Sequence, residues 1–199
     1  MTGTERVVSL FERFHDPVYI HPDPLEIVRG YPDPLEREVA ALICAAFALG
    51  NVTAIVNFER ALLSRLAGVP RESCLKLSAD DMEALIAPLR YRFYTTAEIA
   101  AFLAGTGAVL REYGSLNSAF LSFLDPGAED TRDALASLVA AIRARGGGGR
   151  CVLPDPGKES ACKRLHLFLK WMVRSDAIDP GGWTGVSPRQ LLIPVDTHI

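Results

Sequence analysis

A lysine and an aspartate near the end of the chain are residue types that could carry out a reaction together. Lys163 lies near the start of a stretch with helical periodicity, and Asp196 lies in the terminal segment LLIPVDTHI. A lysine near a helix N-terminus lies in positive potential, which favours the neutral amine that can attack a sugar carbon. An aspartate can accept a proton from that amine and stabilise positive charge on the sugar. The pair would suit a reaction through a Schiff base.

The length of the intervening chain allows these two side chains to meet. A helix from Lys163 to Val173 is about 16 Å long, and the roughly 22 residues from Arg174 to Val195 can easily return that distance. Each residue also has a second possible role. Lys163 could contact a phosphate, and Asp196 could cap a following helix.

The stretch KESACKRLHLFLKWMVR, residues 158–174, is predicted to be an amphipathic helix. At about 100° per residue, Lys163, Lys170 and Arg174 fall on one side. The opposite side is apolar and holds Ala161, Leu165, Phe168, Leu169 and Met172. Residues 143–174 contain eight lysines and arginines against two acids, a local charge of +6 within a chain of net charge −3. This polarity is expected of a surface that binds phosphates, although a solvated helix face has the same pattern.

Two segments of this region resemble those of the endonuclease III-like DNA glycosylases, which share a helix-hairpin-helix. The segments are SACKRLHLFLKWMVRSDAIDPGGW and LLIPVDTHI. The chain is more closely similar to a poorly characterised bacterial family within or beside that superfamily, with a CKRL-FL-WMVR helix, a D-G-W segment and a P-DTH motif. Residues 33–122 also look like that family, whereas the match to proven glycosylases is confined to the C-terminal part.

The resemblance implies a DNA repair enzyme that removes a damaged base after flipping its nucleotide out of the duplex. Asp196 matches the catalytic aspartate of the V-D-T-H motif, and Lys163 matches the lysine nucleophile of members with AP-lyase activity. The residues then expected to contact DNA are Arg164, Lys170, Arg174 and Lys158. In place of the Leu-Pro-Gly-Val-Gly-like turn of the glycosylase hairpin, this chain has PDPGKESACK.

Superfamily members continue beyond the V-D-T-H motif, so we expect this chain to be truncated at its C-terminus. No cofactor is expected within the 199 residues, and the iron–sulfur cysteines of some relatives would lie beyond Ile199. Two alternatives stay open: a helical DNA- or RNA-binding protein of the same fold without catalysis, or a scaffold that binds only proteins. Proximity of Lys163 and Asp196 around a cleft would favour the enzyme.

Composition excludes several classes of protein. With 49% apolar and 23% charged residues of nearly balanced sign, the chain is neither disordered nor basic overall, so any DNA affinity must be local. The longest uncharged apolar run, residues 39–49, is too short to cross a bilayer, and the charged N-terminus is unlike a signal peptide. These features predict a soluble cytoplasmic protein. The cysteines are widely spaced and are predicted to be reduced thiols without a metal: Cys44, Cys74, Cys151 and Cys162.

Helical periodicity without alternating strands predicts an all-α fold, and the resemblance implies the two-lobed glycosylase type. The first lobe is expected over residues 1–145, around a buried core helix near 34–49 that Asp33 caps and Pro34 begins. Further helices are expected over residues 53–67, 78–87, 95–114, 116–124 and 128–144, the third of them weakened by Gly105 and Gly107. A Gly/Pro linker over residues 146–157 leads to the segment 158–199, with the basic helix and the PVDTH motif.

Overall fold

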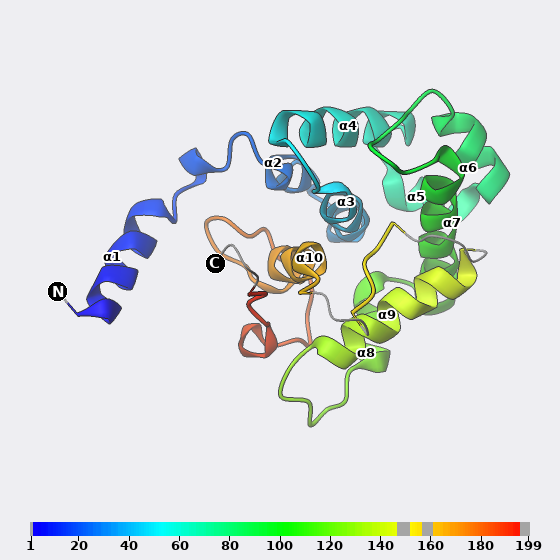
Figure 1. Cartoon of the computed structure of the whole chain (residues 1–199). Coiled ribbons are helices and arrows are strands. Elements are labelled where there is room, and N and C mark those ends of the chain that lie inside the picture. The colour runs from blue at the N-terminus through cyan, green and yellow to red at the C-terminus, as the bar shows by residue number, and fades with distance from the viewer. Residues whose placement is uncertain (1, 147–151, 157–160, 196–199) are drawn as a thin grey trace.

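The computed structural model describes residues 2–146, 152–156 and 161–195, and within these ranges the chain is all-helical without a β-strand, as predicted (Figure 1). None of the described helices is both long and apolar enough to cross a membrane. The elements in chain order are α1 (Gly3–Phe14), η1 (Pro17–Tyr19), α2 (Pro24–Arg29), α3 (Pro34–Phe47), α4 (Val52–Arg65), α5 (Pro70–Lys76), α6 (Ala79–Ile86), α7 (Thr96–Tyr113), α8 (Leu116–Phe123), α9 (Arg132–Arg145), α10 (Lys163–Val173) and η2 (Pro188–Gln190).

Helix α3 forms the centre of the core. The Asp33 side chain accepts the Leu35 N–H at 3.0 Å and Pro34 takes the first helical position, as the sequence predicts. Every residue from Glu38 to Phe47 is buried, because α2, α4, α5, α8 and α10 all pack against this helix. The predicted core helix is therefore confirmed, and it ends two residues earlier than expected.

The other helices predicted before residue 145 are also present, as α4, α6, α7, α8 and α9. Helix α7 is unbroken, although Gly105 and Gly107 were expected to weaken it. A Cβ at Gly105 would collide with the Ile142 carbonyl of α9, and one at Gly107 would collide with the Cys74 carbonyl of α5. The two glycines therefore allow α7 to pack closely against its neighbours on two sides.

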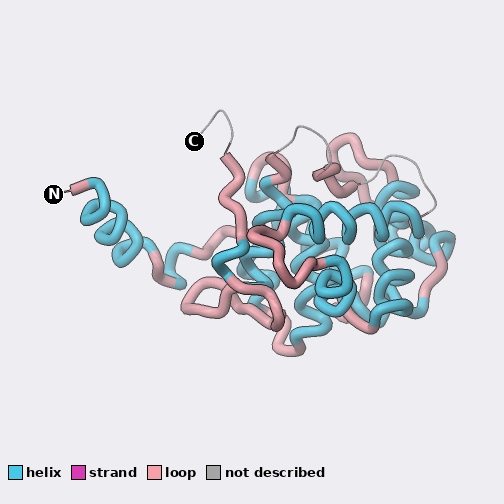
Figure 2. The backbone as a smooth tube through the Cα atoms, turned by 90° about the horizontal axis from the view of Figure 1, so that it is seen from below, coloured by secondary structure: helices cyan, strands magenta, loops and turns pink. Residues whose placement is uncertain are grey.

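Three helices have no counterpart in the sequence prediction: α1, α2 and α5. Helices α2 and α5 are short, so a periodic pattern has little room to develop. Helix α1 lies apart from the other helices in both views (Figures 1 and 2), and none of its residues is buried. Its apolar side chains Val7, Leu10 and Phe11 are exposed to solvent.

Helix α10 packs directly on α3, and its apolar face joins the same core. Phe168 and Trp171 are buried there together with Phe47. The helix begins at Lys163, five residues later than predicted; residues 161 and 162 precede it as non-helical chain, and residues 158–160 lie outside the described residues. In the predicted linker over residues 146–157, Val152 and Leu153 are buried, so this described part is packed into the core.

The buried carboxyl group of Glu38 connects α3 to two other parts of the chain. It accepts the N–H groups of Leu116 at 2.7 Å and Asn117 at 3.0 Å, at the N-terminus of α8. It also accepts the indole N–H of Trp183 at 2.8 Å. Burial raises the pKa of Glu38, and these three donors act in the opposite direction. One side chain thus holds both α8 and the segment after α10 against the core helix.

We expect Glu38→Gln to lower the free energy of unfolding by about 2 kcal/mol, because the amide offers one acceptor oxygen and turns an NH₂ group toward N–H donors. Trp183→Phe, which removes only one donor, should cost about 1 kcal/mol from the lost hydrogen bond. Urea titration followed by circular dichroism measures both values. Equal stability of Glu38→Gln and the unmodified chain would show that the network contributes nothing.

Glu59 on α4 is a second buried acid, and it is fully inaccessible to solvent. Neither of its oxygens has an N–H or O–H donor among the described residues, and the thiol of Cys44 is its polar neighbour. Burial raises the pKa of Glu59 to about 9; the Cys44 thiol opposes this shift and Asp23 adds to it. Glu59 is therefore protonated in the folded chain at neutral pH.

The raised pKa of Glu59 predicts that stability falls as the pH rises from about 5 to about 9. In that window the unfolded chain has lost the proton that the folded chain retains, so the free energy of unfolding drops by at most about 1.4 kcal/mol per pH unit. Glu59→Gln, which resembles the neutral acid, should remove this slope. Urea titrations at pH 5, 7 and 9 test it, and parallel pH profiles for both chains would contradict the prediction.

Candidate functional site

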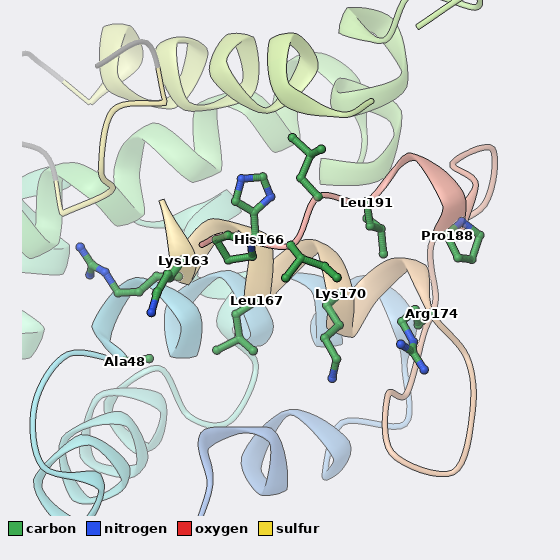
Figure 3. Close-up of a pocket in the computed structure, with 12 residues that line it drawn as sticks. Ala48, Lys163, His166, Leu167, Lys170, Arg174, Pro188 and Leu191 are labelled. Carbon is green, nitrogen blue, oxygen red and sulfur yellow. The ribbon is translucent and has the colours of Figure 1, made fainter. Parts of the chain in front are cut away.

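A pocket of about 690 Å³ lies between α10 and the segment 188–194 (Figure 3). The basic wall comes from α10. The apolar wall comes from Pro188 and residues 191–194. The lining residues are Ala48, Lys163, Arg164, His166, Leu167, Lys170, Arg174, Pro188, Leu191, Leu192, Ile193 and Pro194. Such a pocket suits a ligand that is apolar in one part and anionic in another.

The spacing of residues on α10 places a single stripe in this pocket. Lys163, Leu167, Lys170 and Arg174 recur at intervals of three or four residues, which brings them to one side of the helix. The predicted basic face is therefore present and lines the pocket. The predicted apolar face is buried as well, with Leu165, Phe168, Leu169 and Met172 in the core.

Lys163 is the first residue of α10, where the positive end of the helix dipole lies. The preceding Cys162 has a left-handed backbone with φ of 43°, and its side chain makes no capping hydrogen bond. On the opposite wall the lining extends to Pro194, two residues before Asp196 in the sequence. Asp196 and Lys158 lie outside the described residues, so their predicted roles are untested.

Lys170 and Arg174 form ion pairs with acids at the edge of the pocket. Asp179, whose side chain is fully buried, lies 2.9 Å from Lys170 Nζ and 3.2 Å from Arg174 Nε. Asp176 accepts a further hydrogen bond from Arg174 at 2.7 Å. These two acids lie just beyond residue 174, where the count of +6 ended, and they reduce that local charge to +4.

The loop that carries these acids is fastened to the core by backbone hydrogen bonds. The N–H groups of Gly181 and Trp183 donate to the carbonyls of Trp171 and Met172 at the end of α10. From the other side, Arg29 donates to the Ala177 and Ile178 carbonyls, and Arg37 donates to those of Pro180 and Gly181. Asp179 is thus held in a fixed position beside the basic stripe.

Arg164, which was predicted to contact DNA, makes a structural contact as well. Its guanidinium donates to the Ala46 carbonyl near the C-terminus of α3, where a helix leaves acceptors without intrahelical partners. The Leu49 carbonyl just beyond accepts from Tyr91 at 2.9 Å and from Arg92 at 3.3 Å. Arg164 therefore fixes the start of α10 against the end of α3 while it lines the pocket.

His166 is a pocket residue that the sequence analysis did not select. It lies three residues after Lys163 and lines the same cavity, half-buried. Burial lowers the pKa of His166, an effect that Asp130 opposes and Arg132 reinforces. Its spacing of three residues from Lys163 was the available signal in the sequence.

Metal-ligating groups do not gather in the part of the chain that the structure describes. Cys44, Cys74 and Cys162 are buried thiols outside any disulfide, as predicted for reduced cysteines. Cys151 lies outside the described residues. The pocket is therefore to be understood through its cations, its imidazole and its apolar wall.

A protein family described as "Protein of unknown function (DUF2400)" matches residues 23–199. The chain belongs to this family. The match includes every residue that lines the pocket of this DUF2400 protein and leaves out α1 and η1. No curated protein matches it, and no solved structure does. Membership of an uncharacterised family is thus confirmed, and the link to the DNA glycosylases stays a prediction.

We predict that Asp176 makes the folded DUF2400 protein sensitive to acid. Burial by itself would raise the pKa of Asp176, but N–H donors from Asp179 and Ile178 and the Arg174 guanidinium lower it to about 2. The contribution of Asp176 to the free energy of unfolding is therefore complete above about pH 4. It is lost as the pH falls toward 2, and the loss is at most about 2.4 kcal/mol.

Asp176→Asn should accordingly be less stable at pH 7 and lose less stability between pH 4 and pH 2. Asp133→Asn, at an exposed position on α9, is the matched control and should follow the unmodified chain. Thermal melts across this pH range provide the measurement. Identical acid profiles for Asp176→Asn and Asp133→Asn would rule out a special contribution from Asp176.

Proposed function

We propose that this DUF2400 protein removes damaged bases from DNA, with Lys163 as the amine nucleophile and Asp196 as its proton acceptor. One observation carries the proposal: Lys163 and Pro194 line the same pocket, and Pro194 precedes Asp196 by two residues. Asp196 itself lies outside the described residues, and its place beside Lys163 is part of the proposal. The two residues selected from the sequence thus belong to chain segments that meet at one cavity.

The composition of the pocket supports a flipped nucleotide as its ligand. Its volume of about 690 Å³ lies within the usual range for small-molecule pockets. A nucleobase has an apolar ring face, which Leu167 and Leu191 can cover. The attached phosphates carry negative charge, which suits the cations along α10. The dipole of α10 adds positive potential at Lys163.

In the proposed reaction the Lys163 amine attacks C1′ of the extruded nucleotide. The damaged base leaves with the electron pair of the glycosidic bond, and the proton lost by the amine passes to Asp196. The C1′–O4′ bond of the resulting aminoglycoside then breaks, O4′ takes the proton back from Asp196, and the nitrogen lone pair forms the iminium that joins Nζ of Lys163 to C1′. Borohydride reduces that iminium to a stable amine, so the intermediate can be captured as a covalent adduct.

The ion pairs at the pocket edge favour a second candidate function. Asp179 neutralises part of the charge of Lys170 and Arg174, which weakens their attraction for phosphates. The exposed apolar side of α1 is a surface that a protein partner could cover. A scaffold that binds proteins would use these features without needing a reactive lysine. A DNA- or RNA-binding protein without catalysis would use the cations of the pocket but not the reaction at Lys163.

Borohydride trapping on duplex DNA with an abasic or oxidised-base site tests the enzyme. We expect a covalent adduct that Lys163→Gln abolishes and that Asp196→Asn reduces by about 100-fold. Lys170→Gln is the matched control, because it removes the same charge from the same stripe but no nucleophile. Its adduct should still form, at a higher protein concentration.

Loss of the adduct to the same extent in Lys170→Gln and Lys163→Gln would contradict the assignment of Lys163. Absence of an adduct with every duplex would reject the lyase reaction. Salt-sensitive DNA binding that weakens when Lys163, Lys170 and Arg174 are neutralised would then leave a monofunctional glycosylase or a binding protein without catalysis. Absence of both adduct and binding would leave the scaffold.

A further inference from the structure

His166 differs in kind from the other side chains in the pocket. Among the described lining residues it is the one uncharged side chain that has hydrogen-bonding atoms. The remaining polar residues are Lys163, Arg164, Lys170 and Arg174, whose side chains donate hydrogen bonds and cannot accept them. The rest of the lining is apolar. Within the described lining, a ligand group that donates a hydrogen bond would therefore find its side-chain acceptor at His166.

The imidazole of His166 is also unsatisfied in the folded chain. Its Nδ1 atom is buried without a hydrogen-bond partner among the described residues. Because burial lowers the pKa of His166, the ring is neutral at pH 7, with one N–H donor and one acceptor nitrogen. The charged groups that face it are Asp130 and Arg132 at the start of α9. No contact among the described residues fixes the tautomer at Nδ1. Because Nδ1 is closed off, a ligand in the pocket meets the ring at Nε2, which accepts a hydrogen bond when the ring proton lies on Nδ1.

His166 lies on the opposite side of the pocket from the paired cations. In Figure 3 its ring extends from α10 away from Lys170 and Arg174, with Leu167 on the cation side. One extended ligand can therefore meet the cations with its anionic part and the imidazole with a neutral polar edge. A nucleotide has this arrangement, because its base edge presents hydrogen-bonding groups at a distance from its phosphates.

We propose that His166 selects the base that this protein acts on, by accepting a hydrogen bond from an N–H group on the edge of that base. This inference rests on the proposed function, since it assigns base recognition to the same cavity. It makes His166 a specificity-determining residue, with Lys163 one helical turn away at the sugar. Bases that present an N–H donor toward α10 are then preferred over those that present only acceptors.

Nuclear magnetic resonance of the chain labelled with ¹⁵N-histidine tests this contact directly. The probes are the four free 2′-deoxynucleosides at pH 7, each added up to millimolar concentration. We expect saturable shifts of the His166 ring nitrogens with the nucleosides that carry a suitable N–H group. The rings of His15 and His21, which do not line this pocket, are internal controls and should not shift.

Two substitutions extend the test to base excision. His166→Phe keeps a flat ring without a hydrogen-bonding atom, and we expect it to lose at least about 10-fold in excision of the preferred base. His166→Gln keeps a neutral acceptor and should recover part of that loss. Duplexes with an oxidised purine, an oxidised pyrimidine, uracil or an alkylated base provide the comparison.

The outcomes separate this inference from the proposed function. Trapping through Lys163 without any His166 shift, and with unaltered base preference in His166→Phe, would overturn the role of His166 and leave the enzyme intact. Selective His166 shifts without trapping would support base recognition and refute Lys163 as the nucleophile. Absence of both would reject both proposals.

Discussion

The hydrogen bonds of the Glu38 carboxyl group are the constraint on which the rest of the structure depends. They join the core helix α3 to the start of α8 and to Trp183, in a segment far along the sequence. The centroid of the Trp183 ring lies 5.1 Å from that of Phe168 on α10 and 5.3 Å from that of Phe120 on α8. Through Trp183, one buried acid therefore helps to hold α10, and with it the basic wall of the pocket, against the core.

A second constraint sets the charge of that wall. Asp179 is fully buried, so its carboxylate needs nearby cations, and Lys170 and Arg174 supply them. The contact fixes both long side chains at the pocket edge, which lowers the entropy they would lose on binding a ligand. It also reduces the positive field that would attract phosphates from a distance. The pocket therefore attracts phosphates less strongly from a distance, and its hydrogen-bond donors are already held in place before a ligand binds.

Sequence patterns predicted the elements whose signals are local. The cap and first residue of α3, and the spacing of Lys163, Lys170 and Arg174, depend only on helical geometry, and both were correct. The pairing with Asp179 requires the loop after α10 to fold back, which periodicity does not describe. Glu38 and Glu59 were missed because charged residues are expected at the surface, and their burial depends on partners far away in sequence.

The amphipathic pattern of α10 accounts for the place of the pocket. Because Phe168 and Trp171 must pack in the core with α3, the basic stripe must turn away from the core. The segment 191–194 then crosses that stripe, and Ile193 on it remains 84% exposed. An apolar wall left in water beside fixed cations is a surface that gains stability when a ligand covers it. His166 is the residue that gives this otherwise general surface a means of distinguishing one neutral polar group from another.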